Sequence, residues 1–131
     1  MIGLDANLLV RYITLDDPVQ TRAAVRLIDS LTPQDPGFIS MIVMVELAWV
    51  LEASYNFEKP AVLSVLEALL RSKELLVEQA EVVSRAVRHF AAGSASFADY
   101  LIEQSGRSAR CSYTFTFDRK AAGSARMRLL K

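Results

Sequence analysis

The sequence predicts a single α/β domain, a three-layer α/β/α sandwich on a mostly parallel sheet of four to five short strands. Short apolar runs typical of buried strands alternate with longer segments whose apolar residues recur at helical spacing. Strands separated by helices in this way form a parallel sheet with helices on both faces. The length of 131 residues is that of one domain, and no linker, repeat or low-complexity segment interrupts it. We therefore expect one domain over residues 1–131.

The first third of the chain contains one strand and two helices. Residues 2–4 form a short strand that ends on Asp5, and residues 6–13 follow as a helix. The proline after Asp17 predicts the start of a second helix, because proline is favoured at the first helical position. Two prolines and a glycine between residues 32 and 37 end that helix.

The middle of the chain repeats this alternation. Residues 38–39 are a candidate second strand, and Ser40 is placed to cap a strongly apolar helix that runs to about Tyr55. A second amphipathic helix covers residues 60–72, and residues 75–77 are a third strand candidate.

The last third contains two helices and two strands. One helix ends near Gly93, and the next begins at Ser96. Residues 113–117 alternate with period two and form the clearest strand in the sequence. Residues 127–130 are a candidate edge strand.

Charge is unevenly distributed although the formal net charge is zero. Residues 1–100 carry 8 Lys and Arg against 13 Asp and Glu, whereas residues 101–131 carry 7 against 2. An acidic body with a basic tail suits a phosphodiester substrate, if the acids hold cations and bases such as Arg119 and Lys120 bind phosphates. A solvated surface that is merely uneven is the alternative.

Composition limits the cellular setting. Hydrophobic residues make up 52% of the chain, which excludes disorder. Cys111 is the only cysteine, so an intramolecular disulfide is impossible and a reducing, cytoplasmic setting is expected. Asp5 and Arg11 interrupt the first apolar stretch, so no signal peptide is predicted. The apolar run 41–51 is shorter than the roughly 20 residues that span a bilayer.

Four acidic residues are candidates for a site. Asp5 and Asp118 each follow a predicted strand, and ligands of such folds bind where the strands end, but each could equally cap the next helix. Glu46 lies in a helix that is apolar on every side, so its carboxylate is expected near the core, bound to a metal or paired with Arg11 or Arg22. Local pattern favours a capping role for Asp99, three residues after Ser96.

A cluster of carboxylates has a clear chemical use. Two carboxylates 4 Å apart repel by about 4 kcal/mol at an effective dielectric constant of 20, so such a cluster needs a cation. Mg²⁺ and Mn²⁺ prefer oxygen ligands and bind substrate phosphates. A bound metal also activates water and stabilises charge on phosphoryl oxygens.

Four motifs together resemble those of the PIN domain, and more narrowly those of VapC-type toxins of bacterial toxin–antitoxin pairs. They are Met1 to Asn7 with Asp5, Ser40 through Val45-Glu46-Leu47, Phe97-Ala98-Asp99, and Thr116-Phe117-Asp118-Arg119. The match runs over essentially the whole chain, in the family's order and spacing. One departure is Ala6, where family members commonly have Thr or Ser; the missing hydroxyl would weaken support of the metal ligands.

The resemblance implies a ribonuclease that uses Mg²⁺ or Mn²⁺. It carries the family's catalytic and metal-binding acids over to Asp5, Glu46, Asp99 and Asp118, and its supporting polar positions to Asn7, Ser40 and Thr116. It also implies RNA as substrate, a cognate antitoxin that packs over the active-site groove, and a homodimer. The apolar helices predicted over 41–51 and 60–72 are the expected dimer contact and the border of that groove.

Two other classes of function remain as alternatives. A phospho-acceptor module of the receiver kind also gathers acids at strand ends, but it needs an acidic pair near its first strand, and this chain has only Asp5 there. A catalytically inactive interaction domain would have no use for all four acids. We expect His89 to be a partly exposed helix residue and Trp49 to pack in the core or at an interface, neither of them with a catalytic role.

Overall fold

The computed structural model describes all 131 residues and contains seven helices and five strands. The chain divides into two compact units, which are described separately: unit 1 is Met1–Glu78 and unit 2 is Gln79–Lys131. None of the helices combines the length and the hydrophobicity needed to cross a bilayer.

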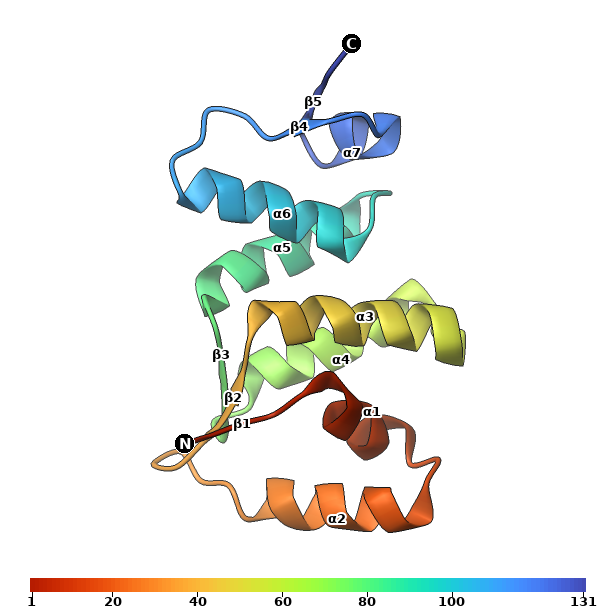
Figure 1. Cartoon of the computed structure of the whole chain (residues 1–131), viewed down its shortest axis with the longest axis vertical. Helices are drawn as coiled ribbons and strands as arrows, with labels where there is room; N and C mark the ends of the chain where they lie inside the picture. Colours follow the sequence, from red (N-terminus) through yellow and green to blue (C-terminus); the bar gives the residue numbers. More distant parts are fainter. The chain divides into compact units, whose positions relative to one another are not determined.

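Unit 1 holds three strands and four helices (Figure 1). In chain order they are β1 (Ile2–Gly3), α1 (Ala6–Thr14), α2 (Pro18–Asp29), β2 (Gly37–Ile39), α3 (Met41–Tyr55), α4 (Lys59–Arg71) and β3 (Leu75–Val77). The strands form one sheet in the order β1-β2-β3, and both pairings are parallel. The register places Gly37 of β2 beside both Ile2 and Leu75.

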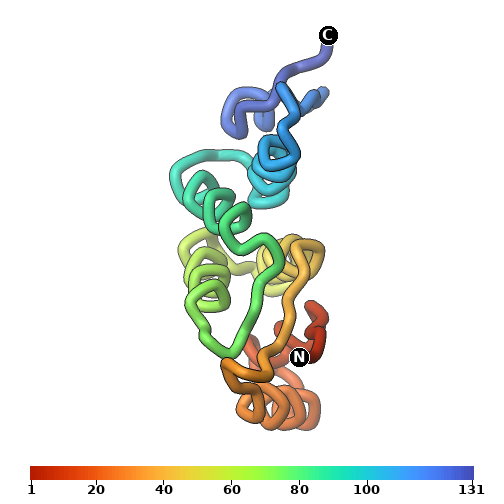
Figure 2. Tube along the Cα trace, turned by 90° about the vertical axis from the view of Figure 1, so that its left-hand side faces the viewer, coloured from red at the N-terminus to blue at the C-terminus, as the bar shows by residue number.

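The core of unit 1 lies between its helices and this sheet. Helix α1 packs against α2 and α3, and α3 packs against α4; Figure 2 shows α3 and α4 side by side. The largest fully buried side chains come from four of these elements: Leu9, Ile39, Met44, Leu47, Leu51, Val62 and Leu66. The helical spacing of apolar residues over 60–72 predicted an amphipathic helix, and α4 does bury one face, formed by Val62, Leu66 and Leu69.

Unit 2 holds three helices and two strands. They are α5 (Ala80–Ala92), α6 (Phe97–Ser108), β4 (Phe115–Thr116), α7 (Arg119–Ser124) and β5 (Arg128–Leu129). Helices α5 and α6 pack together around aromatic side chains: the ring of Phe90 lies 6.0 Å from that of Phe97 and 6.5 Å from that of Tyr100. Strands β4 and β5 form a separate parallel pair.

The predicted α/β class and its short parallel strands are confirmed, with one boundary to correct. Residues 113–117 were predicted as the clearest strand, yet only Phe115–Thr116 has strand structure. Its partner β5 offers two residues for pairing, and Asp118 already belongs to the start of the next helix. Alternating aromatic residues thus gave a longer pattern than the backbone pairing supports.

Candidate metal and nuclease site

The first part of the candidate site is a pocket of about 410 Å³ in unit 1, between α1 and α3. Two of the predicted acids, Asp5 and Glu46, line it together with the predicted supporting residue Asn7. Its other lining residues are apolar or polar side chains of the same two helices: Ala6, Val10, Arg11, Val50, Ser54 and Tyr55. The structure therefore brings together two acids that are 41 residues apart in the sequence.

Asp5 caps a helix and still has a free carboxylate oxygen. Its Oδ1 accepts a hydrogen bond of 2.9 Å from the backbone N–H of Leu8, which satisfies one of the unpaired donors at the start of α1. Its Oδ2 has no partner in the structure. The capping role and the metal-binding role that the sequence left open are therefore compatible in one side chain.

Glu46 does not lie near the core, so the prediction drawn from its apolar neighbours is wrong. Within unit 1 the helix α3 buries one face, formed by Met44, Leu47, Ala48 and Leu51, and Glu46 lies on the exposed side. The reason is that apolar residues also occupy the outer face: Ile42 is 78% exposed and Trp49 is 66% exposed. A helix that is apolar all round does not reveal from sequence which side is buried.

Arg11 is not paired with Glu46 but is held by other groups. Its Nη1 donates to Asp16 Oδ1 at 3.2 Å and to the Tyr55 hydroxyl at 3.0 Å, and its Nε donates to Gln20 at 2.6 Å. The Tyr55 hydroxyl in turn donates to Asp16 Oδ2 at 2.6 Å. Arg22, the other candidate partner of Glu46, is exposed on α2.

These contacts shift the ionisation of Asp16. Hydrogen bonds from Tyr55 and Thr14, and then the charge of Arg11, lower the pKa of the Asp16 carboxyl. The Tyr55 hydrogen bond and the charge of Asp16 also raise the pKa of Arg11. Because the folded-state pKa of Asp16 is depressed, its contribution to stability is present above its unfolded-state pKa and is lost as the pH falls through the folded-state value.

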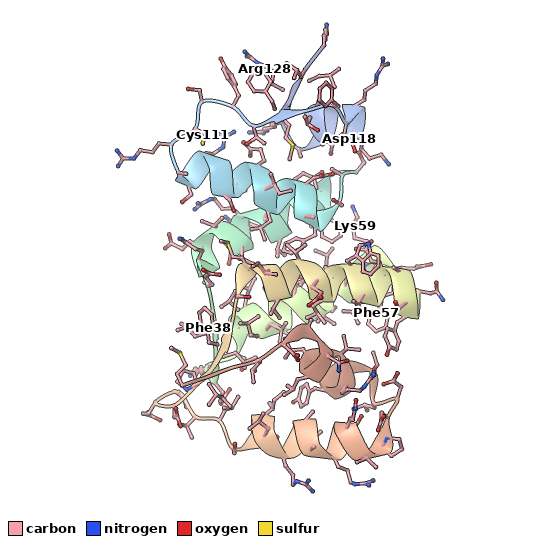
Figure 3. The ribbon with its side chains drawn as sticks, viewed as in Figure 1. Phe38, Phe57, Lys59, Cys111, Asp118 and Arg128 are labelled. Atoms are coloured by element: carbon pink, nitrogen blue, oxygen red, sulfur yellow. The ribbon has the colours of Figure 1, made fainter.

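The second pair of acids lies in unit 2. Asp118 caps α7, with its Oδ1 accepting from the backbone N–H groups of Lys120 at 2.8 Å and Ala121 at 3.1 Å. The predicted supporting residue Thr116 fixes Asp118 from the strand side, since its hydroxyl oxygen accepts from the Asp118 N–H at 3.0 Å. Figure 3 marks Asp118 where β4 meets α7. As in Asp5, the second carboxylate oxygen has no partner.

Asp99 lies on the first turn of α6, as its spacing from Ser96 predicted. The Ser96 hydroxyl oxygen accepts from the Asp99 N–H at 3.1 Å, so Ser96 caps the helix. The Asp99 side chain itself makes no hydrogen bond or ion pair in the structure, so the capping role that the local pattern favoured for Asp99 is wrong and Ser96 alone caps the helix. Ser40 is likewise a helix cap, accepting from the Val43 N–H at 3.2 Å.

The remaining predicted residues have simple positions. Arg119 and Lys120 are both exposed on the first turn of α7. Lys120 also lines a pocket of about 580 Å³ with Gly93 and Ser124. His89 is partly exposed, as expected, and its ring stacks on Tyr100 with centroids 6.3 Å apart.

Neither unit alone gathers three side chains that could hold a metal ion. Of the four predicted acids, Asp5 and Glu46 lie in unit 1, and Asp99 and Asp118 lie in unit 2. All four side chains are carboxylates, whose hard oxygens suit Mg²⁺ and Mn²⁺ and not softer metals. The donor chemistry therefore fits a divalent cation.

The chain belongs to the PIN-domain family, whose model matches residues 2–126. This confirms the family predicted from the sequence, which is a family of nucleases. Among solved structures, the chain is similar to that of Mycobacterium tuberculosis VapC20, described as a sarcin-ricin loop cleaving toxin, with 20% identity, a TM-score of 0.47 and 94% of each chain covered. No protein of curated function matches the sequence.

Sequence reasoning missed the roles of Arg11 and Tyr55 in the pocket. Arg11 follows Asn7 by four residues, so both lie on one face of α1, and this spacing could have placed Arg11 beside the acids. Tyr55 gives no such signal, because it reaches Arg11 across 44 residues of sequence.

Proposed function

We propose that the chain is a metal-dependent ribonuclease, and that its two units act together as one PIN domain. The observation that carries this proposal is the pocket lined by Asp5 and Glu46, within a chain whose family match spans both units. The four acids of the family's motifs, Asp5, Glu46, Asp99 and Asp118, would hold Mg²⁺ or Mn²⁺ and hydrolyse RNA phosphodiester bonds.

The residues of the proposed site would have separate roles in holding the cation and the RNA. Asp5 and Asp118 each use one oxygen to cap a helix, so the carboxylate is fixed before a ligand arrives and its other oxygen stays available. Thr116 restrains the backbone at Asp118. The bound cation would neutralise the acids, activate water and stabilise charge on the phosphoryl oxygens. Arg119 and Lys120 would attract the phosphate backbone.

The experiment is cleavage of a structured RNA by the purified chain with Mn²⁺ or Mg²⁺, and with a chelator. We expect cleavage with metal and none with chelator. Glu46→Gln should reduce turnover by orders of magnitude, since the amide keeps the shape of the side chain but removes its charge. The matched control is Glu52→Gln, also exposed on α3 but outside the pocket. Equal turnover of Glu46→Gln and the wild-type chain would contradict the role of Glu46.

We further propose that the chain is the toxin of a type II toxin–antitoxin pair and forms a homodimer. Support comes from the sequence motifs and from α3, where Ile42 and Trp49 are exposed within about one turn on either side of Glu46. The helical partner segment of an antitoxin could pack its apolar side chains on such a strip. Light scattering at micromolar concentration tests the dimer: a clean monomer would refute it without affecting the nuclease proposal.

A further inference from the structure

The pocket of unit 1 has groups of opposite charge in its wall. Asp5 and Glu46 are its acids, and Arg11 is its only Lys or Arg. We propose that Arg11 binds a phosphate of the RNA backbone next to the one that is cut. This inference rests on the proposed ribonuclease function and adds a substrate-binding residue that lies outside the four acidic motifs.

Arg11 is held in place before any ligand binds. Its Nε is bound by Gln20 on α2, and its Nη1 by Asp16 and by Tyr55 at the end of α3. The bond between Tyr55 and Asp16 closes this network. A guanidinium fixed from three segments loses little conformational freedom when it binds an anion.

One nitrogen of the Arg11 guanidinium remains available for a ligand. Its Nη2 carries two N–H groups and has no partner in the structure, and the side chain is 24% exposed. Guanidinium groups form strong, charge-assisted hydrogen bonds with phosphate oxygens. Although Asp16 shares the charge of Arg11, it is bound through Nη1, so Nη2 is free for a second anion.

The charge of Arg11 also opposes the electrostatic repulsion between the pocket and an RNA strand. Without a positive group, a pocket with two carboxylates would repel an RNA strand wherever the metal did not neutralise it. Arg11 places a cation in the wall of that same pocket, whose volume of about 410 Å³ is in the range of small-molecule sites. A phosphate flanking the cut site would then meet Arg11 while the scissile phosphate meets the acids.

The test measures binding of a fluorescein-labelled 12-nucleotide oligouridylate to the full chain, in the inactive Asp118→Asn background with Mg²⁺, over a series of NaCl concentrations. Adding Arg11→Gln should weaken binding roughly tenfold, as for one charged hydrogen bond. It should also reduce the slope of log K against log [salt] by about 0.7, the value for one lost phosphate contact on single-stranded RNA. Arg71→Gln, which removes an exposed charge at the end of α4, is the control and should change neither.

A purely structural role for Arg11 is distinguished by breaking the network and keeping the guanidinium. Asp16→Asn removes the carboxylate that Arg11 and Tyr55 share, and should lower the melting temperature while leaving the salt slope intact. If Arg11→Gln and Asp16→Asn lower the melting temperature alike and neither changes the slope, Arg11 is structural and the inference is overturned. No binding of oligouridylate would overturn it as well.

Failure of this inference and failure of the proposed function give different results. A chain that cleaves RNA but whose Arg11→Gln variant keeps the full salt slope refutes the inference alone. If the chain never cleaves RNA but binds it through Arg11, the proposed ribonuclease activity is refuted, whereas the proposed binding of phosphate by Arg11 stands.

Discussion

Units 1 and 2 differ in charge but contribute equally to the proposed site. Unit 1 carries 6 Lys and Arg against 11 Asp and Glu, a net charge of −5, whereas unit 2 carries 9 against 4, a net charge of +5. Each unit nevertheless supplies two of the four acids, one of which caps a helix. Unit 1 contains the pocket lined by Asp5 and Glu46. Unit 2 carries the net positive charge, which would attract the negatively charged backbone of RNA.

The largest expected effect tests whether the acids of both units are equally necessary. Asp5→Asn in unit 1 and Asp118→Asn in unit 2 should each reduce RNA cleavage by orders of magnitude. Asparagine caps helices as well as aspartate does, so both variants should keep the wild-type melting temperature without metal, or exceed it because repulsion between acids is lost. Cleavage assays and circular dichroism measure the two properties.

Asp17→Asn is the matched control. Asp17 also caps a helix through one oxygen, accepting from Val19 and Gln20, but it belongs to none of the four motifs. Its variant should cleave RNA at the wild-type rate. If Asp118→Asn were also fully active, Asp118 would not belong to the catalytic site, and the equal contribution of the two units would be refuted.

The next effect concerns metal binding measured through stability. A ligand that binds only the native state stabilises it, by about 2.7 kcal/mol at a concentration of one hundred times its Kd. Mn²⁺ or Mg²⁺ should therefore raise the melting temperature of the wild-type chain. Asp5→Asn and Asp99→Asn, one variant in each unit, should both abolish the rise. A melting temperature that does not depend on metal in the wild-type chain would contradict a shared site.

A smaller effect probes the packing of unit 2. A Cβ on Gly93 would lie 1.8 Å from the Tyr100 hydroxyl and 2.7 Å from the Ser124 hydroxyl, where no atom can fit. Gly93→Ala should therefore displace the Tyr100–Ser124 hydrogen bond and destabilise the chain by about 1–3 kcal/mol. Gly123→Ala is the control, since no atom lies within 4 Å of its Cβ position. Thermal unfolding compares them, and equal stabilities would contradict the close packing around Gly93.

The smallest effect compares one serine cap from each unit. Ser40→Ala at the start of α3 and Ser96→Ala at the start of α6 should each cost about 1 kcal/mol of unfolding free energy. Chemical denaturation measures this cost. RNA turnover by the Ser40→Ala variant, measured at a temperature where the variant is folded, then shows whether Ser40 has a role beyond capping. Wild-type turnover would make it a cap only, and reduced turnover would make it a supporting residue of the site.

Features set by local sequence were predictable, and features set by distant contacts were not. The caps at Asp17, Ser40 and Ser96 depend on hydrogen bonds to backbone groups two or three residues away, so pattern alone located them. The buried side of α3 depends on which elements pack against it, and for this reason the exposure of Glu46 was predicted wrongly.

The candidate site also combines features set by local sequence with features set by distant contacts. The positions of Asp5 and Asp118 between a strand and a helix were predictable from the sequence, whereas Asp99 became a candidate for the site only through the resemblance to a family. The network of Arg11, Asp16 and Tyr55 joins residues up to 44 positions apart, and no local pattern encodes it. Long-range contacts of this kind were beyond what the spacing of apolar residues could indicate.

The capping aspartates have a consequence for how such a gene could change. Aspartate and asparagine codons differ by a single base, and the amide oxygen can accept the hydrogen bonds that Asp5 and Asp118 accept at their helix starts. If Asp5 and Asp118 are metal ligands as proposed, a single-base change from aspartate to asparagine at either codon would therefore remove the activity and leave the fold in place.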